Sequence, residues 1–366
     1  MKPLEGGNMA MTQSNWGNKF RAVWIIGVVL WAACHSFAKD PIVIGDLKVS
    51  PGEMGAGYLV VPAKKDPGCS IPVTVINGAK DGKILALIAA VHGYEFTPIL
   101  SLYRLKSMID PQKLAGTLVL VHIANLPGFQ KRTIGGYNPL DGKDLNRVFP
   151  GDPNGTTTQR IAYVLTEEVV KKCDALVDLH CGDGNEDVIP QCYWMLSGDE
   201  KLDKISRDMV LAFGIKHNII VKSPTKDIAQ SKMLMLAAVL LSKPAFASES
   251  SLGRTDEEDI LGNLTGIMSV MRYFRMVEGE ASFVAEPVWI DELETISSEV
   301  DGLFYPQTKV GSYLSKGEKF GTMTDYLGNV IREFRSPLTG IVMLIINTPS
   351  ANAGDLLFVV GTIKRD

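Results

Sequence analysis

The stretch ILALIAAVHGYEFTPIL, residues 84–100, decides the fold of this chain. Its first half, Ile84–Val91, is continuously apolar, which is typical of a β-strand that is covered on both faces. From Phe96 onward the apolar residues recur three and four apart, and this spacing predicts a helix. A buried strand that leads directly into a helix indicates an α/β fold with a mainly parallel sheet.

The same alternation of strand and helix continues toward the C-terminus. Further apolar runs predict buried strands at residues 116–126 (GTLVLVHIANL), 175–180 (ALVDLH), 217–223 (HNIIVKS) and 244–250 (PAFASES). Helices are expected at residues 157–172 and 256–276, and a long polar loop at residues 127–153. Strands that alternate with helices predict a mainly parallel sheet with helices on both faces.

The pattern of apolar and turn-forming residues changes after about residue 280. The remaining chain consists of short β-type runs separated by Gly, Pro, Asp and Asn, without a long helical period. We therefore expect an α/β domain at residues 39–280 and a small all-β domain, barrel-like in shape, at residues 281–366.

The sequence pattern of residues 1–38 predicts a signal peptide. Lys19 and Arg21 precede an uncharged apolar run at residues 22–33, which is too short to span a bilayer but suits a signal-peptide core. Small residues then stand where cleavage before Lys39 would require them. We expect an exported protein, periplasmic or secreted, without stable membrane insertion after processing. An uncleaved membrane anchor and a lipid anchor at Cys34 are the alternatives.

Composition limits the classes of partner. The chain has 366 residues, of which 46% are hydrophobic and 21% charged, and its formal net charge is −4. A weakly acidic chain gives no electrostatic reason to expect nucleic acid or an anionic membrane as a partner. Spacing alone does not choose a pairing for the cysteines that would remain after processing, Cys69, Cys173, Cys181 and Cys192. The oligomeric state is likewise left open.

Two predicted strand ends carry residues that can bind a metal. His92 ends one buried strand, Glu95 follows three residues later, and His180 ends another. Ligand sites in open α/β sheets form at the carboxyl ends of strands, and we expect Gly93 to permit the turn between His92 and Glu95. Two histidines and a glutamate leave a fourth position open, as in catalytic zinc sites. Asp178 either orients the His180 ring or is a satisfied polar group.

The remaining histidines of the predicted fold are weaker candidates. His122 lies within its apolar run rather than at the end of a strand, so we prefer His180 as the ligand. His217 begins a predicted strand, and we therefore expect it at the opposite edge of the sheet.

The long polar loop contains NPLDGKDLNRVFPG, residues 138–151. Loops of this length inside a compact domain are usually functional. Arg147 offers a planar guanidinium that suits a carboxylate, but it can equally pair with Asp141 or Asp144 in its own loop.

Glu249 ends the predicted strand in PAFASES, beside small residues. Near a zinc-activated water, such a glutamate can accept a proton and return it to a leaving nitrogen. The alternative is that Glu249 only caps the turn after the strand.

Together, the pieces HGYE, DLNRVFPG, DLH and SES occur in the order found in the succinylglutamate desuccinylase/aspartoacylase family, which this chain resembles between about residues 84 and 253. The resemblance implies a carboxypeptidase-like fold and zinc bound by His92, Glu95 and His180. It also implies Asn146 and Arg147 as the groups that hold a substrate carboxylate. Glu249 would be the general base and acid, and Arg132 would polarise the scissile carbonyl.

The chain departs from the family pattern at Tyr94, where a small polar residue is usual, and at Ser251, where glycine is common. The C-terminal region resembles the small lipoyl-like β-barrel of many members, but its predicted hairpin at residues 334–342 (FRSPLTGIV) has no carrier lysine. No covalent cofactor is therefore expected there.

These observations predict a zinc-dependent hydrolase that cleaves an amide bond in a small, carboxylate-bearing N-acyl amino acid or short peptide. A metallocarboxypeptidase acting on peptides, including cell-wall peptides, is the alternative enzyme. A non-catalytic extracytoplasmic binding protein is the alternative from another class. The acyl group and the amine cannot be named from the sequence.

Overall fold

The computed structural model describes residues 39–250 and 255–364. The predicted signal peptide at residues 1–38 lies outside this part of the chain. The described residues form one compact unit, so the boundary expected at residue 280 stays a prediction. Within the described residues, no helix is both long enough and apolar enough to cross a membrane.

The helices of the described residues are α1 (Phe96–Met108), α2 (Leu126–Lys131), α3 (Thr157–Leu165), α4 (Glu200–Phe213), α5 (Leu234–Leu240) and α6 (Glu257–Tyr273). Shorter turns are the 3-10 helices η1 (Leu145–Arg147) and η3 (Ile228–Gln230) and the π-helical turn η2 (Thr166–Val170).

The strands up to α6 are β1 (Ile42–Ile44), β2 (Leu47–Val49), β3 (Glu53–Val61), β4 (Cys69–Asn77), β5 (Lys80–Ala89), β6 (Ala115–Val121), β7 (Ala175–His180), β8 (Glu186–Val188), β9 (Gln191–Leu196), β10 (His217–Lys222) and β11 (Ala245–Glu249). The later strands are β12 (Val288–Ser297), β13 (Gly302–Pro306), β14 (Tyr313–Leu314), β15 (Lys319–Thr324), β16 (Val330–Arg335), β17 (Gly340–Ile346), β18 (Ser350–Ala351) and β19 (Leu356–Ile363).

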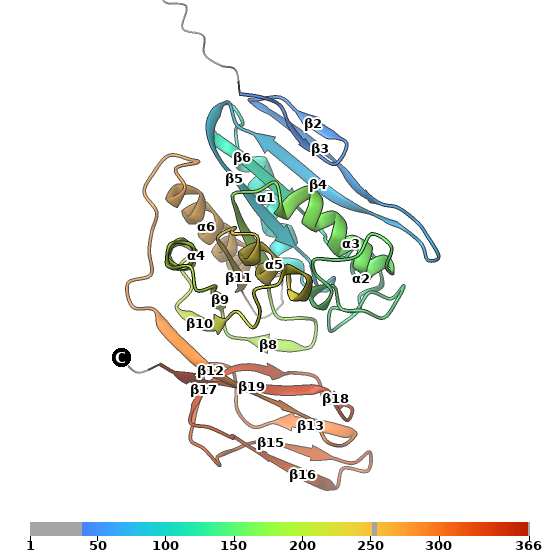
Figure 1. Ribbon diagram of the computed structural model, residues 1–366. Helices are drawn as coiled ribbons and strands as arrows, with labels where there is room; N and C mark the ends of the chain where they lie inside the picture. The colour runs from blue at the N-terminus through green and yellow to red at the C-terminus, as the bar shows by residue number, and fades with distance from the viewer. Residues whose placement is uncertain (1–38, 251–254, 365–366) are drawn as a thin grey trace, which may run out of the picture. The chain divides into compact units, whose positions relative to one another are not determined.

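A large mixed sheet runs through the molecule in the order β14-β17-β19-β12-β10-β9-β11-β7-β5-β6-β4-β3 (Figure 1). Its central strands β6, β5, β7 and β11 are parallel neighbours, so their carboxyl ends meet at one edge. The prediction of an α/β fold with a mainly parallel sheet is confirmed. The next strand, β9, runs antiparallel to β11, and β10 follows β9 in parallel.

Helices cover both faces of the sheet. Leu85 and Leu87 of β5 pack in a core with residues of α1, α4 and α6. Ala86 and Ile88, which alternate with them, pack in a second core with residues of α3 and α5. Both sets of side chains are fully buried, which explains why this strand is continuously apolar in sequence.

The loop expected at residues 127–153 contains more structure than predicted. Asn125 caps α2, because its side chain accepts a hydrogen bond from the Gly128 N–H at 3.1 Å. Asp144 caps η1 in the same way, accepting from the Asn146 N–H at 2.7 Å. Side-chain caps of this kind stabilise helices too short to be visible as an apolar period.

The C-terminal strands are divided between two sheets. β12, β14, β17 and β19 extend the large sheet, whereas β13, β15, β16 and β18 form a four-stranded sheet. Their shared core includes the stacked rings of Phe320 and Phe358, whose centroids lie 3.9 Å apart. The hairpin expected at residues 334–342 is wrong, because β16 pairs with β15 while β17 pairs with β8, β14 and β19.

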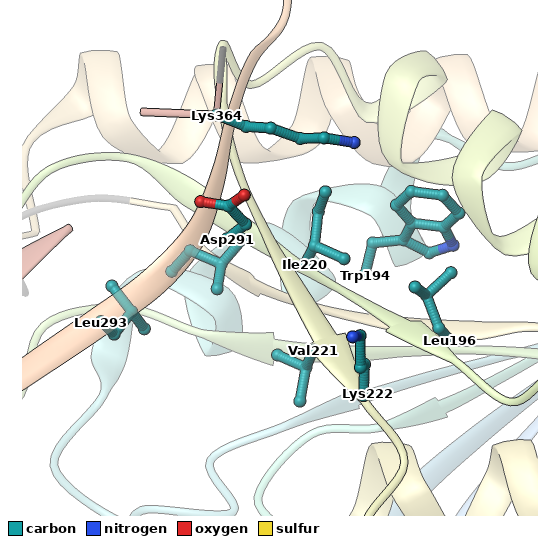
Figure 2. A pocket seen from close by; sticks show the side chains of 9 residues that line it. Trp194, Leu196, Ile220, Val221, Lys222, Asp291, Leu293 and Lys364 are labelled. Carbon is teal, nitrogen blue, oxygen red and sulfur yellow. The ribbon is translucent and has the colours of Figure 1, made fainter. Parts of the chain in front are cut away.

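A hollow of about 630 Å³ lies where β10 and β12 diverge (Figure 2). The two strands pair only as far as Ile219 and Ile290, and β12 then continues along β19. Trp194, Ile220 and Val221 line the hollow. None of its lining residues also lines the cavity described below.

Candidate metal centre

Two parallel strands bring the predicted ligands together. β5 and β7 are direct neighbours, with Ala89 opposite Leu179, so the residues that follow their carboxyl ends lie side by side. His180 is the last residue of β7. His92 follows β5 closely, and Glu95 occupies the N-cap position of α1.

The turn between β5 and α1 contains Ala90 and Gly93. Ala90 adopts the left-handed conformation, with φ at 54°. Gly93 has a different role from the one expected, because a Cβ atom there would lie only 2.2 Å from the backbone nitrogen of Phe129. Glycine is therefore required at this position by the close approach of α2 rather than by the turn itself.

The side chains of His92, Glu95 and His180 converge on one point. The two Glu95 carboxylate oxygens lie 2.7 Å from His92 Nδ1 and 2.9 Å from His180 Nδ1. One ligand atom from each residue lies within 4.8 Å of the other two. Glu95 and His180 are almost fully buried. The structure thus assembles the predicted set of three.

Each imidazole ring has a carboxylate at its outer nitrogen. His180 Nε2 lies 2.9 Å from the Asp178 carboxylate, and His92 Nε2 lies 3.5 Å from the Asp144 carboxylate. Metal-binding histidines commonly place their second nitrogen against a carboxylate, which fixes the ring orientation. Both Nδ1 atoms are therefore left to face Glu95.

The donor set fits zinc. Glu95 Oε2 and His180 Nδ1 are buried, yet neither makes a well-formed hydrogen bond in the described residues. The two atoms lie 2.9 Å apart, so their contact is an ion pair without hydrogen-bond geometry, and a metal ion between them would satisfy both. Two imidazole nitrogens and one carboxylate, with a fourth position open, are a typical catalytic zinc set.

The electrostatics of the cluster depend on Glu95. Burial opposes the protonation of His92, but the Glu95 charge and the hydrogen bonds to Asp144 and Glu95 raise its pKa to about 10. Burial likewise disfavours the charged form of His180, yet Asp178 and Glu95 raise its pKa well above the usual value. Without a metal, His92 and His180 are therefore protonated at neutral pH, and a bound cation would displace these protons.

Glu249 stands beside this cluster. It is the last residue of β11 and lies directly opposite His180 of the parallel strand β7. Burial and the negative charge of Glu95 raise the pKa of Glu249 to about 8. One of its oxygens, Oε2, is buried and has no hydrogen-bond partner in the described chain. A carboxyl group in this setting can hold or release a proton near neutral pH.

A cavity of about 780 Å³ opens over the cluster. Its wall includes Leu344 and Ile346 of β17 and Leu356 of β19. β17 reaches this place because it pairs antiparallel with β8, with Ile346 opposite Glu186. The C-terminal strands β17 and β19 therefore contribute one wall of the cavity at the candidate site.

The predicted substrate-binding residues have different positions. Arg147 lines the cavity with its side chain largely exposed, and its Nη1 lies 3.6 Å from the Asp144 carboxylate. Asn146 does not line the cavity, because its Oδ1 accepts a hydrogen bond from the Leu234 N–H at the start of α5. Arg132 is an exposed C-cap residue of α2 and does not line the cavity either. Its contact with a scissile carbonyl stays a prediction.

The other two histidines of the described residues, His122 and His217, are not part of the cluster. His122 is buried, its Nε2 lies 2.8 Å from Thr74 Oγ1, and its ring stacks on Tyr103. The expectation that His217 lies at the opposite edge is wrong. His217 is in register with Gln191, which is in register with Glu249, because β9 and β10 run against β11.

Sequence reasoning missed three acidic residues of the site. Asp144 was considered only as a partner of Arg147, although it also contacts His92. Asp183 and Glu186 line the cavity, and burial raises the pKa of Glu186 to about 7. Their position after the predicted ligand His180 was the available signal.

The four cysteines of the described chain, Cys69, Cys173, Cys181 and Cys192, are free thiols.

Solved structures share this architecture. A succinylglutamate desuccinylase from Silicibacter sp. TM1040 superposes with a TM-score of 0.77 at 24% identity, covering 89% of this chain and 98% of its own. The product-bound ectoine utilization protein EutE (DoeB) from Ruegeria pomeroyi superposes with a TM-score of 0.76 at 24% identity, covering 88% and 98%. These similarities define the fold class.

The family follows from sequence comparison. The model of the succinylglutamate desuccinylase/aspartoacylase catalytic domain matches residues 81–274, more than half of the chain. This chain therefore belongs to the succinylglutamate desuccinylase/aspartoacylase family, whose members are hydrolases. A curated relative, the N-alpha-acetyl-L-2,4-diaminobutyric acid deacetylase of Halomonas elongata, is 27% identical over 320 residues, which are 84% of this chain and 91% of the relative.

Proposed function

We propose that this chain is a zinc-dependent hydrolase that cleaves the amide bond of a small N-acyl amino acid. The observation that carries the proposal is the convergence of His92, Glu95 and His180 within 4.8 Å, with Glu249 beside them at the end of the next strand. The name of the Halomonas elongata relative, a deacetylase of an acetylated amino acid, supports this substrate class.

His92 Nδ1, His180 Nδ1 and a Glu95 oxygen would hold the zinc ion. Zinc in such a set supplies Lewis-acid activation of water at neutral pH. Asp144 and Asp178 hold the two rings in the orientation that metal binding needs.

Glu249 accepts the proton of the attacking water and returns it to the leaving nitrogen. Its raised pKa, about 8, supports this role because a group that ionises near neutral pH can serve as both base and acid. Arg147 binds the substrate carboxylate, since it lines the cavity, is largely exposed and is held only by a long ion pair, 3.6 Å, to Asp144.

The test is turnover by the purified protein, first stripped of metal and then supplied with zinc. A panel of N-acetyl and N-succinyl amino acids is assayed beside peptides of two to five residues. We expect zinc-dependent release of the free amino acid, with peptides cleaved slowly because residues of the C-terminal strands β17 and β19 form part of the cavity wall. Preferential cleavage of the peptides would indicate a metallocarboxypeptidase instead. Absence of turnover by the zinc-bound protein would indicate a non-catalytic binding protein.

We also propose that the protein acts outside the cytoplasm. The apolar run at residues 22–33 after Lys19 and Arg21 supports this location. N-terminal sequencing of protein from its native host should find a chain that begins at or near Lys39. A chain that still contains Trp24 would instead indicate a retained anchor.

A further inference from the structure

A row of polar side chains crosses three neighbouring strands at the candidate site. Glu249 of β11 lies opposite His180 of β7 on one side and opposite Gln191 of β9 on the other. Residues in register on neighbouring strands project their side chains to the same face of a sheet. Glu249 therefore has a candidate metal ligand on one side and a glutamine amide on the other.

Gln191 is an unusual residue at this position. It is only 2% exposed, and its Nε2 donates a hydrogen bond to Tyr193 Oη at 3.3 Å. Its Oε1 atom is buried and has no partner among the described residues. Because burial of an unsatisfied amide oxygen costs free energy, a hydrogen-bond donor for Oε1 would stabilise the folded protein.

Glu249 also has a buried oxygen, Oε2, without a hydrogen-bond partner in the described chain. The two unsatisfied oxygens thus belong to residues that lie directly opposite each other on β9 and β11. A hydrogen bond between the Gln191 amide and the Glu249 carboxyl group would satisfy both.

The amide can make this hydrogen bond in either of two orientations. A protonated Glu249 donates its O–H to Gln191 Oε1, while Nε2 keeps its contact with Tyr193 Oη. Rotation of the amide by half a turn exchanges its oxygen and nitrogen. Nε2 then donates to an ionised Glu249, and Oε1 accepts the Tyr193 O–H. Glutamine alone among the uncharged side chains of this length offers both a donor and an acceptor.

We propose that Gln191, backed by Tyr193, is a positioning residue that holds the Glu249 carboxyl group toward the cavity throughout the reaction. The inference rests on the proposed function, in which Glu249 carries one proton from the attacking water to the leaving nitrogen as the C–O bond forms and the C–N bond breaks. The amide keeps Glu249 in one orientation while that proton arrives and leaves.

The test is steady-state kinetics of Gln191→Met, which keeps the length of the side chain and removes its hydrogen bonds. We expect kcat to fall by roughly 10- to 100-fold, as for the loss of a hydrogen bond to a charged group, with KM and zinc content unchanged. Tyr193→Phe should lower kcat by only about 2- to 10-fold, because the amide keeps its bond to Glu249.

Asn218→Leu is the matched control. Asn218 is also a fully buried amide with an unpartnered Oδ1, but it lies on β10 opposite Cys192 and so projects to the other face of the sheet. This variant should lose stability and keep its kcat. If Gln191→Met keeps full kcat, or if Asn218→Leu loses kcat to the same extent, the proposal is overturned.

A second measurement is independent of turnover. A crystal structure of the zinc-loaded protein should place the Gln191 amide within about 3.2 Å of a Glu249 oxygen, and a gap too long for a hydrogen bond would overturn the proposal. Failure of the wild-type protein to hydrolyse any N-acyl amino acid would refute the proposed function instead. The two failures are thus distinguishable.

Discussion

Replacement of Asp178 by asparagine should weaken zinc binding without touching a ligand. Asp178 is 1% exposed, and its carboxylate lies 2.9 Å from His180 Nε2. Asparagine keeps the size and an acceptor oxygen but removes the negative charge that orients the ring and increases its basicity. Loss of such a partner typically costs about 10- to 100-fold in metal affinity. Because Asp178 is buried and close, we expect a loss near 100-fold, or about 2.7 kcal/mol.

The variant Asp144→Asn gives a second loss of zinc affinity with which the effect of Asp178→Asn can be compared. The Asp144 carboxylate lies farther from its histidine, at 3.5 Å, and is 15% exposed, so we expect a loss of only about tenfold. Competition with a chromogenic chelator measures both affinities, and Asp291→Asn at the separate hollow of Figure 2 serves as the unaffected control. Wild-type affinity in Asp178→Asn, with an intact fold, would refute the inference that Asp178 supports a metal-binding histidine.

Three further predictions concern single side chains. Glu249→Gln should lower kcat by about 10²–10⁴-fold with zinc content unchanged, and zinc loss in this variant would make Glu249 a ligand instead. Arg147→Ala should raise KM about tenfold or more for substrates with a free carboxylate, whereas equal effects on amidated substrates would make Arg147 a strut of its loop. Burial and then the Lys106 charge lower the pKa of His122 from 6.5 to about 4. The folded state therefore binds fewer protons than the unfolded state in this range, and the stability present above pH 6.5 is lost as the pH falls toward 4. Urea unfolding should show wild-type protein losing up to about 3 kcal/mol more than His122→Gln between pH 7 and 4, and parallel losses would contradict this.

The fold was largely predictable because its central strands are buried on both faces. Ile84–Val91 has no polar residue, and such a run leaves few alternatives to a covered strand. The course of β9 was not predictable in this way. The antiparallel direction of β9 relative to β11 depends on pairing between distant segments. Because β10 is parallel to β9, His217 lies at the edge of the sheet where β11 ends at Glu249.

The candidate ligands were also predictable, since His92 and His180 end buried strands and the carboxyl ends of parallel strands meet. The contacts around them depend on the path of the long loop. Asp144 reaches His92 because the loop brings the start of η1 next to the turn after β5, and Gly93 is needed because α2 approaches it. Local sequence carries no signal for such approaches.

The zinc content of the purified protein is the most direct test of the central claim. Wild-type protein, stripped with a chelator, reloaded with zinc and dialysed, should contain about one zinc ion per chain by inductively coupled plasma mass spectrometry. His92→Ala and His180→Ala should each lose most of it, because each removes one of three protein ligands. Folding of the variants is checked by circular dichroism. Folded variants that retain a full zinc equivalent, or wild-type protein that binds none, would contradict the assignment of His92, Glu95 and His180 as the metal centre.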